Sequence, residues 1–207
     1  MKPGLDAKNR IIEVAGEIFA DCGFRKATVR EICRRAGVNL AAINYHFGDK
    51  ERLYIEVLRH YKQIAFQKNT RNDLTCDTDP PDAQLAAFVK SLVFRLLGEG
   101  QPSCFGKLMA REHIEPTSAL DIIIEEDLRP AFNRLNAIVR QLLGNEANDQ
   151  KVLLCSMSVL GQCLYFRYSK PVISRILRKD CYTVEEIGEI ADHIANYSLE
   201  ALSGLSK

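Results

Sequence analysis

The chain has 207 residues, of which 46% are hydrophobic and 27% charged, a composition typical of a folded globular protein that excludes disorder along the whole chain. It contains no run of about 18 uncharged apolar residues, and no apolar stretch follows the basic residues of MKPGLDAKNR. We therefore expect neither a membrane span nor a secretion signal, and a cytoplasmic location.

Charge is divided unevenly along the chain. Residues 1–62 hold 12 Lys and Arg against 8 Asp and Glu, or +4, whereas residues 63–207 hold 16 against 19, or −3. This division suggests that the first part meets a polyanion and the second does not, although such an imbalance is also common on a solvated surface.

The cysteines are odd in number, scattered, and never spaced C-x-x-C, so neither a disulfide framework nor a zinc knuckle is expected. We interpret them as small buried hydrophobes in a reducing compartment, with redox sensing by one of them as the alternative. No metal and no cofactor is expected. The seven cysteines are Cys22, Cys33, Cys76, Cys104, Cys155, Cys163 and Cys181.

The first part of the chain begins with two helices. Residues 6–22 place apolar side chains at i, i+3, i+4 and i+7, which predicts a core-packed helix that Gly23 ends. Thr28 and Glu31 then form the capping-box pattern T-x-x-E, which predicts a second helix over 29–36.

A short third helix and a longer fourth helix follow. After Gly37, Asn39 is suited to cap a helix over 40–46, which Gly48 breaks. A helix of about two turns is too short to be stable alone in water, so its neighbours must hold it. The fourth helix is expected over 49–68.

Residues 69–82, NTRNDLTCDTDPPD, lack periodicity and contain a Pro-Pro pair, which predicts a loop and the seam between two domains. The first would be a helix-turn-helix domain at 1–50 with a connecting helix at 49–68, and the second would cover 69–207. Six more helices bring the total to about nine or ten, with Pro130 kinking one of them, and the fold class is all-α. They are expected at 83–98, 103–114, 117–143, 148–169, 171–179 and 183–203.

Two short helices joined by a turn that contains glycine are the layout of a helix-turn-helix, whose second helix enters the DNA major groove. The small apolar side chains of Leu40, Ala41 and Ala42 suit a close approach to thymine methyl groups. Asn39 and Asn44 are candidates for hydrogen bonds to base edges or to the backbone.

Other side chains would fix this helix on the phosphates. Tyr45 and His46, at its end, can donate to phosphate oxygens, and Lys50 adds a charge beside the start of the next helix. Arg30 can reach a guanine edge or a phosphate. A partly buried surface pair is the plainer interpretation of Tyr45 and His46, but the agreement of caps, turn, spacing and charge within 30 residues favours DNA binding.

The stretch TVREICRRAGVNLAAINYHFGDKERLY, with its lead-in AGEIFADCGFRKAT, resembles the DNA-binding signature of the TetR family of bacterial one-component repressors over residues 8–60. The resemblance implies a dimer whose small N-terminal domain binds a palindromic operator in double-stranded DNA. It also implies a divergent helical domain in which a small ligand binds and releases the DNA.

By position, the resemblance implies DNA contacts from Thr28, Arg30, residues 39–46 and Lys50. The sequence departs from the family pattern at Asn44, where many members have tyrosine. The aromatic contact to phosphate is therefore assigned to the following residue of the same helix.

The later stretch FGKLMAREHIEPTSALDIIIEEDLRPAFNRL resembles the ligand domain of the CecR (YbiH) subgroup of this family over about residues 83–200. That likeness implies a regulator of efflux or antibiotic-related genes. It does not identify the effector, because ligand identity rarely transfers with such likeness.

The segments 148–169 and 183–203 are apolar on more than one face, and a helix of this kind must bury both faces. We expect them to form a four-helix interface with their mates in a homodimer; the alternative is that both faces lie in the core of one subunit. The expected interface residues are Met157, Leu160, Gly161, Leu164, Ile187, Ile190, Ile194, Tyr197 and Ala201.

Phe105, Met109 and His113 lie at i, i+4 and i+8, and with Phe132 and Tyr165 they are candidates to line a mostly apolar ligand pocket. A stripe of this kind is more often core. The neighbouring Arg and Glu at positions 111 and 112 would be costly to bury unpaired, so they are either exposed or form a paired polar feature.

The sequence thus predicts a regulator, and a repressor in particular, released from its operator by a small, mostly apolar effector that favours one spacing of the reading helices. No nucleophile motif and no phosphate-cradling glycine loop occurs in it, so an enzyme is not expected. Two alternatives remain: a helical protein-interaction module, and a redox-responsive regulator without a small-molecule effector.

Overall fold

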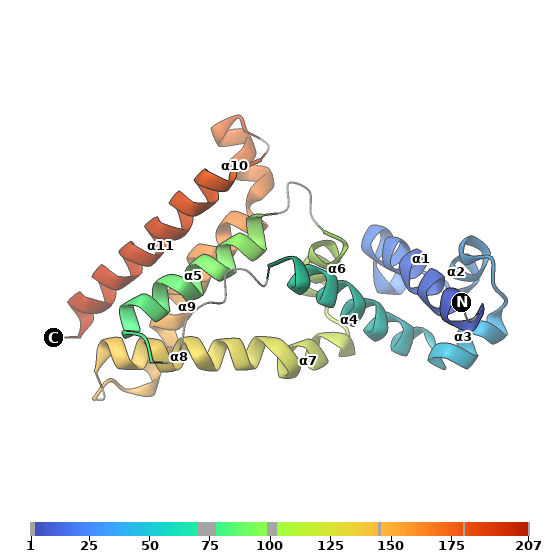
Figure 1. Cartoon of the computed structure of the whole chain (residues 1–207), viewed down its shortest axis with the longest axis horizontal. Coiled ribbons are helices and arrows are strands. Elements are labelled where there is room, and N and C mark those ends of the chain that lie inside the picture. Colours follow the sequence, from blue (N-terminus) through green and yellow to red (C-terminus); the bar gives the residue numbers. More distant parts are fainter. Residues whose placement is uncertain (1–2, 70–77, 99–102, 145, 180, 207) are drawn as a thin grey trace. The chain divides into compact units, whose positions relative to one another are not determined.

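A computed structural model describes residues 3–69, 78–98, 103–144, 146–179 and 181–206. These residues form α-helices and one π-helical segment, with no strand among them, which confirms the all-α prediction (Figure 1). The elements are α1 Pro3–Lys26, α2 Val29–Ala36, α3 Leu40–Phe47, α4 Lys50–Asn69, α5 Pro81–Leu97, α6 Cys104–Ile114, α7 Ser118–Ile123, the π-segment η1 Ile124–Leu128, α8 Arg129–Leu143, α9 Asp149–Tyr168, α10 Lys170–Leu177 and α11 Val184–Leu205.

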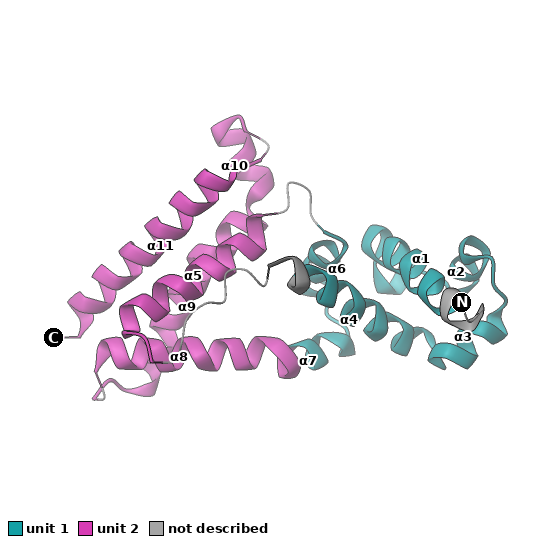
Figure 2. Ribbon diagram, in the orientation of Figure 1, with its two compact units in different colours: residues 1–67, 102–123 teal, residues 68–101, 124–207 magenta. Residues whose placement is uncertain are grey.

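The helices divide into two compact units (Figure 2). Unit 1 combines residues 1–67 with 102–123, and unit 2 combines residues 68–101 with 124–207. This packing differs from a division at a single seam, because α6 and α7 belong with the helices of the N-terminal part. Most of the expected loop, residues 70–77, lies outside the described residues.

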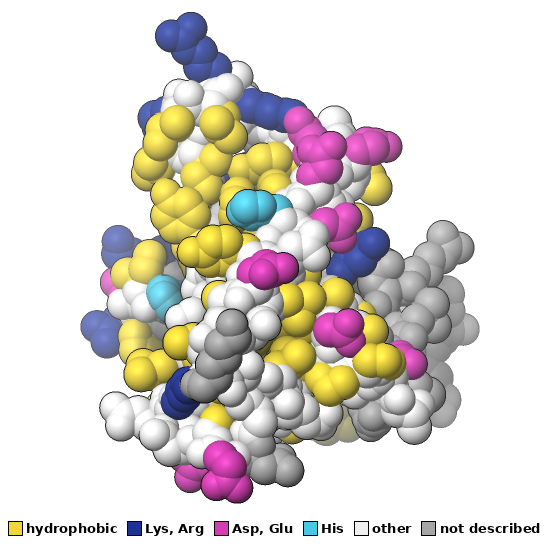
Figure 3. All heavy atoms as spheres, turned by 90° about the vertical axis from the view of Figure 1, so that its left-hand side faces the viewer, with side chains coloured by type: hydrophobic (Ala, Val, Ile, Leu, Met, Phe, Trp, Pro, Cys, Tyr) yellow, Lys and Arg dark blue, Asp and Glu magenta, His cyan; other side chains and the backbone are white. Residues whose placement is uncertain are grey.

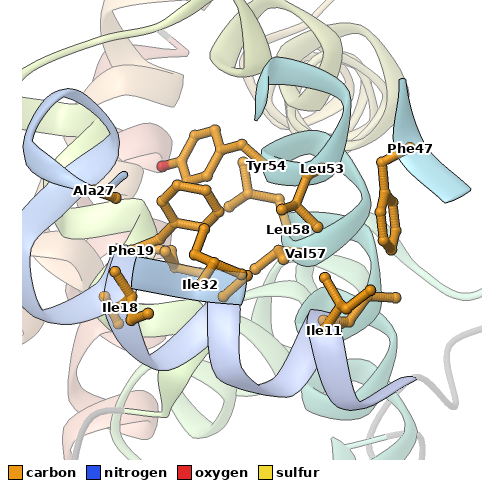
Figure 4. Close-up of a cluster of buried hydrophobic side chains, with 14 of the residues drawn as sticks. Ile11, Ile18, Phe19, Ala27, Ile32, Phe47, Leu53, Tyr54, Val57 and Leu58 are labelled. Atoms are coloured by element: carbon orange, nitrogen blue, oxygen red, sulfur yellow. The ribbon is translucent and has the colours of Figure 1, made fainter. Parts of the chain in front are cut away.

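In unit 1, apolar faces of α1, α2, α3, α4, α6 and α7 meet in one core. Phe19, Ile32 and Ile43 are fully buried there, and so is Leu108 of α6. Figure 4 shows the side chains of Phe19, Ile32 and Tyr54 gathered between α1, α2 and α4. The two-turn helix α3 is held by this core, as its length requires.

The regular part of α1 is interrupted at Gly23, where the sequence predicted the end of the first helix. Gly23 lies inside the span of α1 with φ 80° and ψ 167°, which are not helical values, and its positive φ is one that glycine adopts at little cost. Residues 24–26 form a further turn beyond it.

The long helix expected over 117–143 is interrupted one turn before its proline. Helix α7 gives way to η1 over Ile124–Leu128, and α8 begins at Arg129. Pro130 has no N–H to donate to the preceding turn, so a regular α-helix would leave a carbonyl there without its partner. The irregularity predicted at Pro130 therefore takes the form of a π-helical turn.

Unit 2 is built on α5, α8, α9 and α11, whose apolar stripes form a second core. Helix α11 lies against α5, and its Ile187, Ala191, Ile194 and Leu202 are buried in this core. In the part of the chain that the structure describes, no helix is both long enough and apolar enough to cross a membrane.

Candidate DNA-binding surface

Helix α2 is fixed at both ends by the residues that the sequence indicated. The Thr28 hydroxyl oxygen accepts a hydrogen bond from the Glu31 backbone N–H at 3.2 Å, as an N-cap does. Gly37 adopts a left-handed conformation with φ 63°, and its N–H donates to the Cys33 carbonyl. The turn between α2 and α3 is thus set by local chemistry.

Helix α3 begins and ends in the same way. The Asn39 side-chain oxygen accepts from the Ala42 N–H at 3.0 Å, and Gly48, with φ 83°, ends the helix with its N–H on the Asn44 carbonyl. Asp49 then caps α4 by accepting from the Arg52 N–H at 2.8 Å. Asn39 therefore uses its oxygen as a cap, while its amide N–H groups remain available as donors.

The two faces of α3 differ sharply in exposure. Ile43 and Phe47 are 0% and 5% exposed and anchor the helix in the core of unit 1. On the opposite side Leu40 is 57% and Tyr45 is 85% exposed. The exposed face also carries Ala41 and Asn44, with Ala42 and His46 half-buried beside it, so the residues of α3 that were predicted to meet DNA lie on or beside its exposed face.

The two rings at the end of α3 are in contact. The Tyr45 and His46 rings lie edge to face with centroids 5.0 Å apart. This contact restricts the Tyr45 ring, which otherwise projects into solvent, and leaves its hydroxyl accessible. Thr28 and Arg30, at the start of α2, are also exposed.

Besides the apolar core, charged side chains hold α2 in place. Arg10 donates from Nε to the Ala36 carbonyl at 2.8 Å, and Arg35 pairs with Glu17 at 2.5 Å. Arg34 forms a two-pronged pair with Glu31 and holds the pKa of that carboxyl below its ordinary value. These arginines are therefore engaged within unit 1, and the predicted DNA surface depends on the other residues.

Lys50 does not extend freely from the start of α4. Its ammonium lies 4.5 Å from the centre of the Phe24 ring, and burial lowers the pKa of the group. Sequence reasoning identified Lys50 but missed Phe24, because a residue that follows the glycine at the end of α1 carries no periodic signal.

The five residues expected to line a ligand pocket are divided between the units. Phe105 and Met109 pack against the core of unit 1, and His113 is exposed in the same unit. Phe132 and Tyr165 belong to unit 2, where Tyr165 is 54% exposed. The structure therefore gathers them in neither unit, and Phe105 and Met109 follow the alternative in which such a stripe is core.

The expected dimer residues also separate into two groups. Ile187 and Ile194 are 2% and 1% exposed in the core of unit 2, so they follow the alternative in which this face lies in the core of one subunit. The reason is their helical phase, which they share with the other buried residues of α11. Leu160, Leu164 and Ile190 are half-buried.

The remaining expected dimer residues are exposed. Met157 is 52% and Tyr197 62% exposed, and Gly161 and Ala201 are exposed between them. Helices α9 and α11 are joined there by Gln162, which donates to Ser198 at 3.3 Å. We call the outward stripe of the two helices the outer α9–α11 face; it comprises Leu153, Met157, Gly161, Tyr165, Tyr168, Tyr197 and Ala201. On the side of unit 2 along which α11 runs, Figure 3 shows hydrophobic side chains gathered among acidic ones.

Two families match the chain. The family described as "Bacterial regulatory proteins, tetR family" matches residues 11–57, and the C-terminal domain of the "HTH-type transcriptional dual regulator CecR" matches residues 81–205. CecR of Shigella flexneri is 29% identical over 178 residues, which cover 82% of this chain and 79% of the relative.

Solved structures show the same fold. A putative fatty acid metabolism regulator from Clostridium perfringens has a TM-score of 0.64 at 19% identity and covers 92% of this chain and 97% of that one. A TetR-family transcriptional regulator from Streptomyces coelicolor has a TM-score of 0.63 at 16% identity, with 96% and 97% covered.

A capped pair of short helices that exposes one face of the second, joined to a separate helical unit, defines a transcriptional regulator of the helix-turn-helix class. The chain belongs to the TetR family of bacterial regulatory proteins, with a C-terminal domain of the CecR type. Regulators of this family bind DNA and act as dimers, and release by a ligand is typical of them.

Proposed function

We propose that this protein is a dimeric repressor in the cytoplasm that binds a palindromic operator through α3 and leaves it when a small, mostly apolar effector binds unit 2. The observation that carries the proposal is the exposed face of α3. Leu40, Ala41, Asn44 and Tyr45 project from a helix whose other face is anchored by fully buried side chains. A rigid, small-surfaced helix of this kind suits the major groove.

The division of roles follows from chemistry. Leu40, Ala41 and Ala42 are assigned to thymine methyl groups, and the amide groups of Asn39 and Asn44 to base edges. Tyr45, His46, Thr28 and Lys50 are assigned to phosphates, with Arg30 reaching either. Phosphate contacts position the protein, whereas base contacts read sequence.

A dimer is required because one short helix makes few base contacts. Two copies of α3 held about 34 to 36 Å apart would read successive turns of the major groove on one side of DNA. The outer α9–α11 face is the surface that we assign to the partner, because it is the apolar stripe of those helices that the unit 2 core does not cover.

Binding to the promoter region beside the protein's own gene, measured at several salt concentrations, tests the proposal. A regulator of this kind should give a steep fall of log K with log salt and a saturable preference over random DNA. Flat salt dependence, or equal affinity for every duplex, would contradict it.

Two variants then separate the proposed roles. Lys50→Ala should weaken binding to all duplexes about equally, whereas Ala42→Ser should change the preferred sequence. If both variants alter affinity and preference in the same way, the assignment of phosphate and base contacts is wrong even though the protein binds DNA.

A further inference from the structure

A line of contacts within unit 1 connects Lys50 to a buried carboxylate on α6. The Lys50 ammonium lies 4.5 Å from the centre of the Phe24 ring, and the Phe24 and Tyr54 ring centres lie 5.1 Å apart. The Tyr54 hydroxyl donates to Glu112 Oε1 at 2.7 Å. The line thus links α6 to the end of α1 and to the first turn of α4, where Lys50 begins the helix.

The carboxylate of Glu112, at one end of this line, is held in place by hydrogen bonds. It is 1% exposed, and a carboxylate in such a place is costly unless hydrogen bonds satisfy it. Besides the Tyr54 hydroxyl, it accepts from the Thr117 backbone N–H at 2.9 Å and from the Thr117 hydroxyl at 3.0 Å. The site therefore suits an acceptor with several lone pairs rather than an apolar side chain.

Tyr54 is suited to be the donor. It is 1% exposed, and burial first, then its hydrogen bond to Glu112, raise its pKa well above the ordinary value. It therefore keeps its proton at any physiological pH. Its ring also meets the Phe19 ring edge to face at 4.8 Å, so its orientation is fixed both by packing and by the carboxylate.

Helix α6 also contacts the backbone just before Phe24, through the side chain of Arg111. Arg111 donates from Nε to the Ala20 carbonyl at 3.1 Å and from Nη2 to the Asp21 carbonyl. Its side chain passes 3.3 Å from where a Cβ on Gly23 would lie. Neighbouring residues of α6 thus contact both the turn before Phe24 and the tyrosine against which Phe24 packs.

We propose that Glu112 is a positioning residue for DNA binding, because it fixes Tyr54 and through it the Phe24 ring on which Lys50 rests. A lysine has a long flexible stem, and fixing that stem costs conformational entropy when it binds a phosphate. The Phe24 ring restrains the ammonium beforehand through a cation–π contact. The proposal rests on the assignment of Lys50 to a phosphate.

It also assigns a role to the turn after α6. The donors that complete the Glu112 site come from Thr117, in that turn, and Ser118 beside it donates to Glu51 in the first turn of α4. A shift of this turn that withdrew Glu112 from Tyr54 would loosen Lys50 while leaving the base-reading face of α3 in place.

A double-mutant cycle in the full-length protein tests the proposal. Tyr54→Phe, Lys50→Ala and the double variant are compared in binding to the duplex from the promoter region beside the gene, by fluorescence anisotropy across salt concentrations. Tyr54→Phe alone should weaken binding by up to about fivefold, the loss expected if the cation–π contact of Lys50 at an exposed site were no longer formed. It should also lower the salt slope by up to about 0.9, which corresponds to one phosphate contact.

In the Lys50→Ala background, Tyr54→Phe should cause no further loss. The same loss in both backgrounds would mean that the hydroxyl acts only on the general fold, and would overturn the proposal. Tighter binding by Tyr54→Phe would also overturn it, because the ring would then withhold Lys50 from DNA.

Tyr61→Phe is the matched control. Tyr61 lies on the same helix, and its hydroxyl donates to the Glu13 carbonyl at 3.4 Å, outside the line from Lys50 to Glu112. This variant should leave affinity and salt slope unchanged. If Tyr54→Phe proves too unstable to measure, Phe24→Leu against Phe24→Tyr replaces it, and only the variant without an aromatic ring should lose affinity.

The two proposals fail in distinguishable ways. A wild-type protein that binds no duplex, including those selected from a random library, would overturn both. A wild-type protein that binds with a steep salt slope but gives an additive cycle would overturn only the positioning role of Glu112.

Discussion

At the scale of single residues, Asn39 has two roles that a substitution can separate. Its oxygen caps α3 by accepting from the Ala42 N–H, while its amide N–H groups are assigned to DNA. Asparagine is among the best N-caps because its short side chain reaches the backbone donors of the first turn.

Asn39→Ala should lower the free energy of unfolding by about 1 kcal/mol, the usual cost of losing such a cap, and should also weaken specific DNA binding. Asn39→Asp keeps an oxygen for the cap but has no amide, so it should unfold like the wild type and still bind DNA poorly. Urea unfolding and anisotropy measure the two quantities. Wild-type affinity in Asn39→Asp would remove Asn39 from the set of DNA contacts.

The sequence identified Asn39, Thr28 and the two glycines of this region correctly because caps and turns are local. Each depends on chemistry within three or four residues, which a single sequence displays. The Lys50–Phe24–Tyr54–Glu112 line was not predictable, since it joins residues up to 88 positions apart. The only signal was the cost of burying a charged pair on α6.

At the scale of elements, the crossing of α1 and α4 depends on a glycine. A Cβ on Gly16 would lie 2.1 Å from Tyr61 Cε2, so the ring rests directly on the backbone of α1. On α11, by contrast, a Cβ on Gly188 would meet nothing within 4 Å.

Gly16→Ala should therefore destabilise the protein by about 1 to 3 kcal/mol, the usual range for overpacking. Gly188→Ala should instead stabilise it by up to about 1 kcal/mol, because alanine favours the helix and fills open space. Thermal melts of the two variants measure this difference. A stabilised Gly16→Ala would mean that the Tyr61 ring moves aside at little cost.

The outer α9–α11 face gives a test of subunit contact. Met157→Glu would place a charge in the centre of the proposed interface, and a buried unpaired charge is strongly unfavourable. The variant should sediment as a monomer at micromolar concentration with unchanged helix content. The control is Ile114→Glu, which alters an exposed apolar residue of unit 1 and should remain dimeric. A dimeric Met157→Glu would place the interface elsewhere.

Helix positions were predictable along most of the chain, but which side of α11 is buried was not. Its apolar residues cover more than one side, so periodicity alone could not say which stripe enters the core and which meets a partner. The structure places Ile194 inside and Tyr197 outside, three residues away. That choice depends on packing against α5, α8 and α9, which lie far away in the sequence.

At the scale of the whole molecule, stability should fall at alkaline pH. Burial raises the pKa of Cys163 from its ordinary 9.0 to about 12 and that of Cys104 from 9.0 to about 11. The folded protein then keeps protons that the unfolded chain releases, and stability decreases with pH wherever the folded state binds more protons. The contribution is complete below pH 9 and is lost as pH rises through these folded values.

Thermal melts should therefore decline from about pH 9 upward, and Cys163→Ala should decline less steeply between pH 9 and 11. Cys181→Ala is the control, because that side chain is exposed. If the melting temperatures of the two variants decline with pH at the same slope, ionisation of the Cys163 thiol is not the cause of the lost stability.

Unit 1 is discontinuous along the chain, since residues 102–123 return to it after the excursion through 68–101. During translation, the segment bearing the reading helix leaves the ribosome well before the carboxylate that accepts from the Tyr54 hydroxyl. Until α6 emerges, the Tyr54 hydroxyl lacks the Glu112 carboxylate as its acceptor, and the part of the unit 1 core that Leu108 fills is exposed to water. A nascent chain of some 70 residues therefore has an incomplete hydrophobic core. A messenger RNA truncated at this point should yield a polypeptide that is degraded, and not a small protein that competes for the operator.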